Sequence, residues 1–217
     1  KKANSGDNQA KKELKILETL LISLSDGIPA RVIDLEKDDL LIIKSLQLLT
    51  LKPIMYVCNV EENSASVGNI LSSKVEAIAK SKNAKCLIIS AVIEEEISKL
   101  ENIDDSILFL NDLGLDEPGL NKIIKVGYRL LQLITFYTVG PKEAHAWTVT
   151  EGSTAPKAAG KIHSDFEKGF IRAEIIPYED YVNYGGEQAC KDTGKMRVEG
   201  KTYIINDSDI INVLFNI

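Results

Sequence analysis

The chain has 217 residues and a mass of 23.9 kDa, enough for one large domain or two modest ones. Hydrophobic residues make up 44% of it and charged residues 27%, values typical of a folded globular protein, which exclude collagen-like and broadly disordered chains. The longest stretch without a charge is the twelve positions of Leu130–Pro141, whereas a membrane helix needs about 18 apolar residues. We therefore expect no membrane partner.

Charge and cysteine content narrow the class of protein further. The 26 basic and 32 acidic residues give a net charge of -6, which disfavours strong nonspecific nucleic-acid binding. Three cysteines, odd in number and without a C-x-x-C pair, predict neither a zinc site nor a disulfide framework, and so indicate a reducing, cytoplasmic setting. Cys58 and Cys86 lie in apolar runs, so we expect two buried thiols without chemistry. Neither His145 nor His163 has the spacing of a metal-binding helix, and no metal site is predicted.

The first fifty residues are predicted to be helical. One helix carries an apolar stripe of four leucines at alternating spacings of three and four, and Gly27 ends it: Leu14, Leu17, Leu21 and Leu24. A second helix follows Asp34 and stops before Pro53. Because the stripe has no evident partner among these elements, we expect an antiparallel helical arm that precedes the chain.

From Pro53 the pattern changes to that of an α/β domain. The short apolar runs at 54–60 and 86–92 predict buried parallel strands, and Val67–Ser81 has helical spacing between them. Such a strand, helix and strand form a right-handed crossover unit. A further helix is predicted from about Pro118, with Asp116 as its N-cap.

After about residue 133 the chain is predicted to form a small α+β domain, compatible with a β-grasp sheet. The expected elements are strands at 135–139, 144–149 and 170–176, a helix at 155–162, a segment at 178–184, and closing strands at 202–205 and 210–215.

Polar residues follow the first predicted strand, where ligands bind at the carboxyl edge of a parallel sheet. Asn59, Val60 and Glu62 stand where P-loop GTPases carry the base-reading sequence N-K-x-D. Ser90 and Ala91 end the second strand and match the S-A pair that closes the base pocket in those enzymes. A solvated loop is the alternative for each motif alone, but their occurrence one crossover unit apart favours a nucleotide site.

Two further observations concern phosphate binding. No G-x-x-x-x-G-K-[ST] occurs in the chain, so the phosphate cradle of a P-loop enzyme is absent from these residues. Lys195, Arg197 and Lys201 cluster within seven positions, which indicates either a solvated face or an edge that contacts phosphates of RNA.

Long stretches of the chain resemble the YchF/Obg-like ATPase family. The resemblance covers nearly the whole chain and is most specific at residues 46–60, 109–115, 140–148 and 155–174. It implies three parts: residues 1–49 as the returning arm of a helical coiled-coil insertion, residues 50–133 as the last portion of a P-loop nucleotide-binding domain, and residues 134–217 as a TGS domain.

The resemblance also implies a function. Family members carry N-x-x-E in place of N-K-x-D, here Asn59 and Glu62, together with a preference for ATP over GTP, and Val60 maps to the residue whose backbone meets the base. Ser90 and Ala91 map to the fifth motif. The P-loop, the switches and the Mg²⁺ ligands all precede the arm in the family, so no catalytic residue is assigned in this chain.

The sequence thus predicts an α/β chain: a partial P-loop domain with a parallel sheet, preceded by a helical coiled-coil arm and followed by a β-grasp TGS domain. We expect a fragment of a ribosome-associated ATPase that binds ATP or GTP with Mg²⁺ when intact and is inactive as a fragment. The alternative is a noncatalytic module that binds RNA or the ribosome through the TGS domain.

Overall fold

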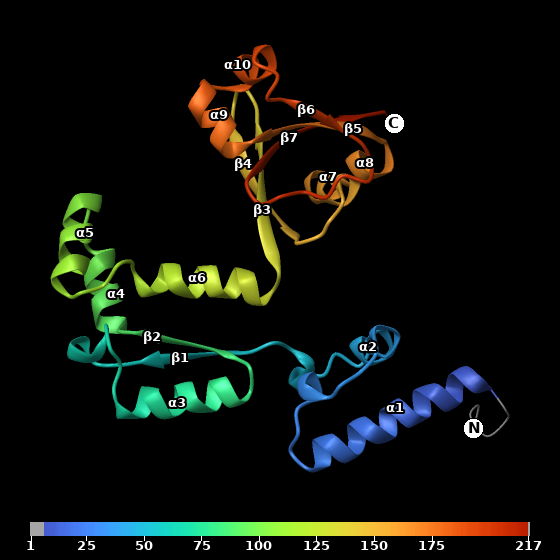
Figure 1. Ribbon diagram of the computed structural model, residues 1–217, viewed down its shortest axis with the longest axis vertical. Coiled ribbons are helices and arrows are strands. Elements are labelled where there is room, and N and C mark those ends of the chain that lie inside the picture. Colours follow the sequence, from blue (N-terminus) through green and yellow to red (C-terminus); the bar gives the residue numbers. More distant parts are fainter. Residues whose placement is uncertain (1–6, 217) are drawn as a thin grey trace. The chain divides into compact units, whose positions relative to one another are not determined.

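The computed structural model describes residues 7–216, which divide into two compact units. The N-terminal unit extends to Val126 and the C-terminal unit begins at Gly127, a boundary that falls inside helix α6 (Figure 1). Within residues 7–216, no helix combines the length and the hydrophobicity needed to cross a bilayer.

The N-terminal unit contains helices and one two-stranded parallel sheet. Its elements are α1 (Asn8–Ser25), η2 (Ala30–Val32), α2 (Lys37–Lys44), η3 (Leu49–Leu51), β1 (Met55–Asn59), η4 (Glu62–Ser64), α3 (Ile70–Ser81), β2 (Lys85–Ile89), α4 (Ala91–Ser98), α5 (Ile103–Asp112) and α6 (Gly119–Leu130), where η marks a 3-10 helix.

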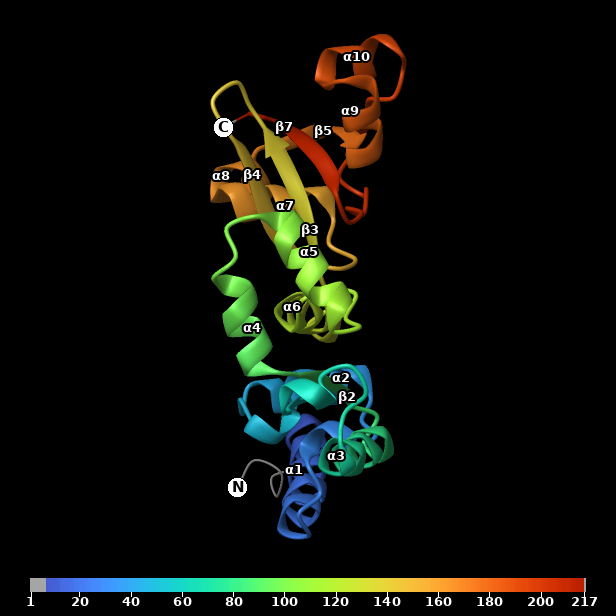
Figure 2. The same cartoon turned by 90° about the vertical axis from the view of Figure 1, so that its left-hand side faces the viewer.

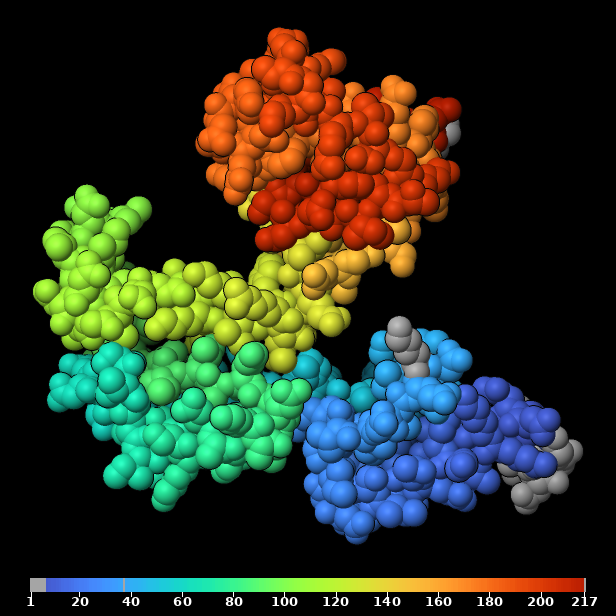
Figure 3. Space-filling view, viewed as in Figure 1, coloured from blue at the N-terminus to red at the C-terminus, as the bar shows by residue number. Residues whose placement is uncertain are grey.

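Helix α1 is confirmed, but its predicted packing is wrong in part. The helix starts at the N-cap Asp7 and is followed by Gly27, whose φ is +75°. A second apolar face, formed by Ile16 and Leu20, packs on Ala30 and Ile43, so α1 does have a partner in the chain. The predicted leucine stripe lies on another face, where Leu14, Leu17 and Leu21 are exposed, and α1 presents much of its length at the visible surface (Figure 3).

The crossover unit β1, α3 and β2 is confirmed. The strands are parallel, with Val57 paired to Leu87, and α3 packs on them. Asn69 caps α3 by accepting from the N–H groups of Leu71 and Ser72, and the Ser72 hydroxyl accepts from the Asn69 N–H.

The predicted burial of these strands is wrong. Val57 is 41% exposed, and Cys58 and Cys86 are half-buried. Hydrophobic runs of this kind are typical of parallel strands covered on both faces, whereas a two-stranded sheet leaves edges and part of a face uncovered.

The N-terminus of α6 differs from the prediction. Gly119 begins the helix, so Asp116 lies too far upstream to be its N-cap. The Glu94 carboxylate from α4 caps it instead, accepting from the Gly119 N–H at 2.6 Å and the Leu120 N–H at 3.0 Å. Helices α4 and α5, which the sequence analysis did not predict, pack through Ile93 and Leu110.

The C-terminal unit contains a mixed five-stranded sheet with the order β4-β3-β7-β5-β6, of which β3, β4, β5 and β7 are labelled in Figure 2. The pair β3–β7 is parallel and the other pairs are antiparallel. Its elements are β3 (Leu133–Val139), β4 (Ala144–Thr150), α7 (Ala155–Ile162), α8 (Ser164–Lys168), β5 (Phe170–Pro177), α9 (Tyr178–Tyr184), α10 (Glu187–Asp192), β6 (Arg197–Glu199) and β7 (Asp209–Phe215).

Successive side chains along each strand point to opposite faces of this sheet, so the sheet has a hydrophobic cluster on each face. Ile175 and Ile211 belong to the larger cluster beneath α7, whereas their neighbours Ile176 and Ile210 pack with Cys190 of α10. Helices therefore cover both faces.

One predicted strand is wrong. Residues 202–205 form only an isolated bridge between Thr154 and Ile204, and the edge strand is β6. The side chain of Tyr203 turns to the buried carboxylate of Asp209, to which its hydroxyl donates at 2.8 Å. This contact and the Asn206 N–H donated to the same carboxylate hold the segment in a turn.

Candidate nucleotide-binding site

The two predicted base-pocket motifs lie together at the carboxyl edge of the β1–β2 sheet. Asn59 is the last residue of β1, and its side-chain oxygen accepts from the Ala91 N–H at 2.9 Å. Ala91 is the first residue of α4, which directly follows β2. This hydrogen bond joins positions 32 residues apart and ties the loop after β1 to the loop after β2.

Val60 continues the pairing beyond the end of β1. Its N–H donates to the Ile89 carbonyl at 2.9 Å, and its side chain is buried. The Val60 N–H is therefore occupied within the protein, and only its carbonyl remains for a ligand.

Glu62 lies exposed at the start of η4, while its neighbour Glu61 organises the loop. The Glu61 carboxylate accepts from the Ser64 hydroxyl at 3.1 Å and from the Asn69 side-chain amide at 3.2 Å. Hydrogen bonds from its own backbone N–H and from Ser64 lower the pKa of Glu61. The loop is therefore fixed through Glu61 and Asn69, leaving the Glu62 carboxylate at the surface.

Ser90 occupies the N-cap position of α4 with an unpartnered hydroxyl. The residue is only 2% exposed, and its Oγ has no hydrogen-bond partner within residues 7–216. An unpaired hydroxyl in a buried position is costly. The Ser90 hydroxyl is enclosed by the protein, so a ligand at this edge would meet the exposed polar side chains at the end of β1 and in the loop after it, Asn59 and Glu62.

The contacts made by Glu61, Asn69 and Glu94 were not predicted from the sequence. The pattern of Asn69 followed three residues later by Ser72 is a capping signal that could have been recognised. Glu94 offered no such signal, because its partners lie 25 and 26 residues away.

The basic cluster of the C-terminal unit is partly neutralised. Lys195 lies 3.3 Å from the Asp180 carboxylate and over the Tyr184 ring, and the hydrogen bond to Asp180 raises its pKa. Arg197 donates to the Tyr203 hydroxyl at 3.2 Å and lies 3.8 Å from Glu199. Lys201 is exposed in the turn after β6.

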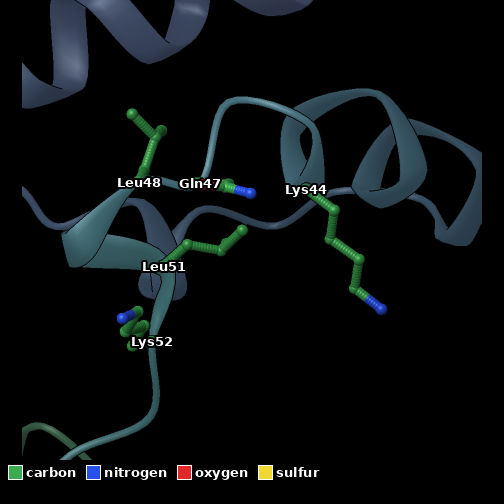
Figure 4. A pocket seen from close by; sticks show the side chains of 5 residues that line it. All are labelled: Lys44, Gln47, Leu48, Leu51 and Lys52. Carbon is green, nitrogen blue, oxygen red and sulfur yellow. The ribbon is translucent and has the colours of Figure 1, made fainter.

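A cavity of about 370 Å³ lies elsewhere in the N-terminal unit, between α2 and η3. Figure 4 shows Gln47, Leu48 and Leu51 gathered between Lys44 and Lys52. None of these residues belongs to the predicted nucleotide site. Across residues 7–216 there is no group of three or more His, Cys, Asp or Glu side chains that could hold a metal ion.

Comparisons with known proteins agree along the whole chain. The family model YchF-GTPase_C, described as a protein of unknown function (DUF933), matches residues 133–216. The "Ribosome-binding ATPase YchF" of Haemophilus ducreyi is 49% identical over 217 residues, and those of Escherichia coli O157:H7 and Bacillus subtilis are 46% and 42% identical. Each match covers the whole of this chain and 59% or 60% of the relative, so the chain spans about three-fifths of their length.

A solved structure agrees with these sequences. The structure of the Schizosaccharomyces pombe YchF GTPase matches with a TM-score of 0.83 and 34% identity, over 94% of this chain and 55% of that one. A GTP-binding protein from Pyrococcus horikoshii, 20% identical with a TM-score of 0.57, shares the fold. The chain belongs to the YchF family.

Proposed function

We propose that the intact protein is a ribosome-associated P-loop ATPase and that this chain supplies the base-binding end of its nucleotide site. The observation that carries the proposal is the Asn59–Ala91 hydrogen bond, which joins the two predicted base-reading loops. The relatives are named ribosome-binding ATPases, which supports the ribosome and ATP as partners of the intact protein.

The residues present fit one end of a nucleotide. Asn59 fixes the two loops with its side-chain oxygen, and the Glu62 carboxylate lies exposed in the loop after β1, where a ligand can reach it. The chain contains no P-loop motif, so residues outside these 217 would hold the phosphates and Mg²⁺. When bound, Mg²⁺ neutralises charge on the phosphates during transfer.

A preference for ATP over GTP is part of the proposal and rests on Glu62. The carboxylate of N-K-x-D accepts two N–H groups of guanine, whereas adenine presents the N1 lone pair at that edge. Sites built to pair such groups discriminate by about 10⁴ or more, so losing the guanine contact lowers GTP affinity.

The base preference is tested by titrating ATP and GTP into the intact protein, which has the length of its relatives and is called family-length protein below. Val60→Lys with Glu62→Asp should move the affinity ratio toward GTP by at least about tenfold, or 1.4 kcal/mol. Because Val60 is buried, Glu62→Asp alone is measured beside it and should shift the ratio in the same direction by less. An unchanged ratio in both variants would place base selection outside the loop after β1.

We assign residues 1–49 to the returning coiled-coil arm, 50–133 to the nucleotide domain and 134–217 to the TGS domain. The exposed leucine face of α1 supports an arm helix that receives a second helix. The mixed sheet with its central parallel pair β3–β7, covered by α7, supports a β-grasp TGS domain. A cytoplasmic location stays a prediction from cysteine usage.

ATP hydrolysis and ribosome cosedimentation of the family-length protein test the proposed function as a whole. The protein should hydrolyse ATP in the presence of Mg²⁺ and cosediment with ribosomes. Sedimentation without hydrolysis would favour the noncatalytic binding module, and the absence of both would contradict the proposal.

A further inference from the structure

The carboxylate of Glu94 joins the start of α4 to the start of α6. Glu94 lies in the first turn of α4, and its two oxygens accept from the Gly119 N–H at 2.6 Å and from the Leu120 N–H at 3.0 Å. Both donors lie in the first turn of α6, where backbone N–H groups have no partner within the helix. A carboxylate that accepts such N–H groups makes charge-assisted hydrogen bonds, which are stronger than neutral ones.

The first turn of α4 also forms part of the proposed base-binding edge, because α4 follows directly from β2 (Figure 1). Three residues before Glu94, the Ala91 N–H donates to the Asn59 side chain at 2.9 Å. Two residues further back, the Ile89 carbonyl accepts from the Val60 N–H at 2.9 Å. The stretch from Ile89 to Glu94 therefore contacts the loop after β1 at one end and the start of α6 at the other.

Gly119 allows α6 to lie close to this stretch. A Cβ built at Gly119 would clash with the side chain of Ile89 and with the carboxylate of Glu94. Gly119 is buried, so this contact is shielded from water. The two residues that it meets are thus the end of β2 and the carboxylate that caps α6.

Apolar packing holds α4 independently of Glu94. Its neighbour Ile93 is 1% exposed and belongs to a cluster with Leu110 of α5 and with Ala65, which follows η4 in the loop after β1. This cluster does not involve the Glu94 carboxylate. We therefore expect a Glu94 variant to keep α4 folded and to lose only the fixed position of its first turn.

We propose that Glu94 is a positioning residue of the nucleotide site, because its contact with α6 keeps the Ala91 N–H in place for Asn59. Glu94 acts on the base-binding loop through these two residues and does not touch the nucleotide. The inference rests on the proposed function and adds to it a residue that neither base-reading motif contains. Since the phosphates would be held by residues outside these 217, the effect of Glu94 is confined to the base end of the nucleotide.

The test measures the affinity of family-length protein for ATP and for inorganic tripolyphosphate, both with Mg²⁺, by calorimetric titration. Tripolyphosphate carries the phosphates of ATP without its base. Glu94→Ala should weaken ATP binding by at least about fivefold and change tripolyphosphate binding by less than about twofold. Glu94→Gln retains one acceptor oxygen and should weaken ATP by a smaller factor than Glu94→Ala does.

The matched control is Glu96→Ala, which removes a carboxylate from an exposed position of the same helix. It should leave both affinities within about twofold of wild type. An equal loss of ATP affinity in Glu96→Ala and Glu94→Ala would reduce the effect to net charge and overturn the inference.

Two further outcomes separate the inference from the proposed function. Equal losses for ATP and tripolyphosphate in Glu94→Ala would show that Glu94 supports the fold of the whole site and would overturn the positioning role. Unchanged ATP affinity in Glu94→Ala, together with a loss in Asn59→Ala, would refute the role of Glu94 and leave the proposed base site standing. If neither variant weakens ATP, the proposed function fails at this edge as well.

Discussion

At the scale of single residues, packing is close where α6 meets β2 and α4. A Cβ on Gly119 would stand 2.7 Å from the Ile89 side chain and 2.8 Å from the Glu94 carboxylate. Gly119→Ala should therefore lower the free energy of unfolding by about 1–3 kcal/mol, through overpacking and a displaced helix cap. Gly127 in the same helix has nothing within 4 Å, so Gly127→Ala should stabilise by about 0.5–1 kcal/mol. Urea unfolding of both variants measures the difference, and equal effects would contradict it.

The thiol pair of the β1–β2 sheet gives a pH-dependent prediction. Cys58 and Cys86 lie with their Sγ atoms 3.8 Å apart, and desolvation followed by the Cys58 contact raises the pKa of Cys86 from 9.0 to about 11. A raised pKa means that the folded protein binds the Cys86 proton more tightly than the unfolded chain does. The protonated thiol therefore adds to the free energy of unfolding below pH 9.0, and this contribution is lost as pH rises from 9.0 through about 11.

Alkylation by iodoacetamide, which requires the thiolate, should therefore have a midpoint near pH 11 at Cys86. In Cys58→Ser the midpoint should fall but stay above 9.0, because desolvation is the larger cause. Peptide mass spectrometry separates Cys86 from Cys190. A wild-type midpoint at or below 9 would show that Cys86 is solvated.

At the scale of elements, α1 shows what the leucine spacing could and could not predict. The spacing of Leu14, Leu17 and Leu21 correctly predicted a helix, but these residues are exposed, whereas Ile16 and Leu20 contact Ala30 and Ile43. Two apolar faces on one helix are compatible with the same periodicity, so only the tertiary partner decides which is buried. The same limit explains the half-exposed strands β1 and β2, since an apolar run predicts a strand and not its cover.

Truncation of apolar side chains in the helical region should lower the free energy of unfolding strongly where the side chain is buried and little where it is exposed. Ile43 is fully buried in the α1–α2 cluster, so Ile43→Ala should destabilise the protein by about 2–4 kcal/mol. Leu21 is 67% exposed, and Leu21→Ala should cost under about 0.5 kcal/mol. Thermal melts followed by circular dichroism compare the two. A larger effect at Leu21 would mean that the leucine stripe is the packed face.

At the scale of the whole molecule, most elements and the meeting of the loops after β1 and β2 could be predicted from sequence. Asn59 and Ala91 were placed at one sheet edge because parallel strands end together, and their hydrogen bond follows from that topology. The cap from Glu94 and the thiol contact could not be predicted. Each joins residues from separate elements, and no local pattern records such a contact.

If this chain supplies only the base end of a nucleotide site, as proposed, the 217-residue chain should be inactive alone. It lacks the P-loop amides and lysine that bind phosphates, so ATP affinity should be millimolar at best and no hydrolysis should exceed a buffer blank. Phosphate release assays after removal of contaminating ATPases measure this. Turnover that persists would show a phosphate site among these residues.

The central claim, that the loops joined by Asn59 form the base end of a nucleotide site, is tested most directly by ATP and GTP titrations of family-length protein. Asn59→Ala removes the acceptor for the Ala91 N–H and should weaken both nucleotides by about tenfold or more. Asn63→Ala makes the same chemical change at an exposed position of the neighbouring 3-10 helix and should leave both affinities within twofold of wild type. Equal affinities for wild type and Asn59→Ala would contradict the claim and would indicate that the loop after β1 is a solvated connection.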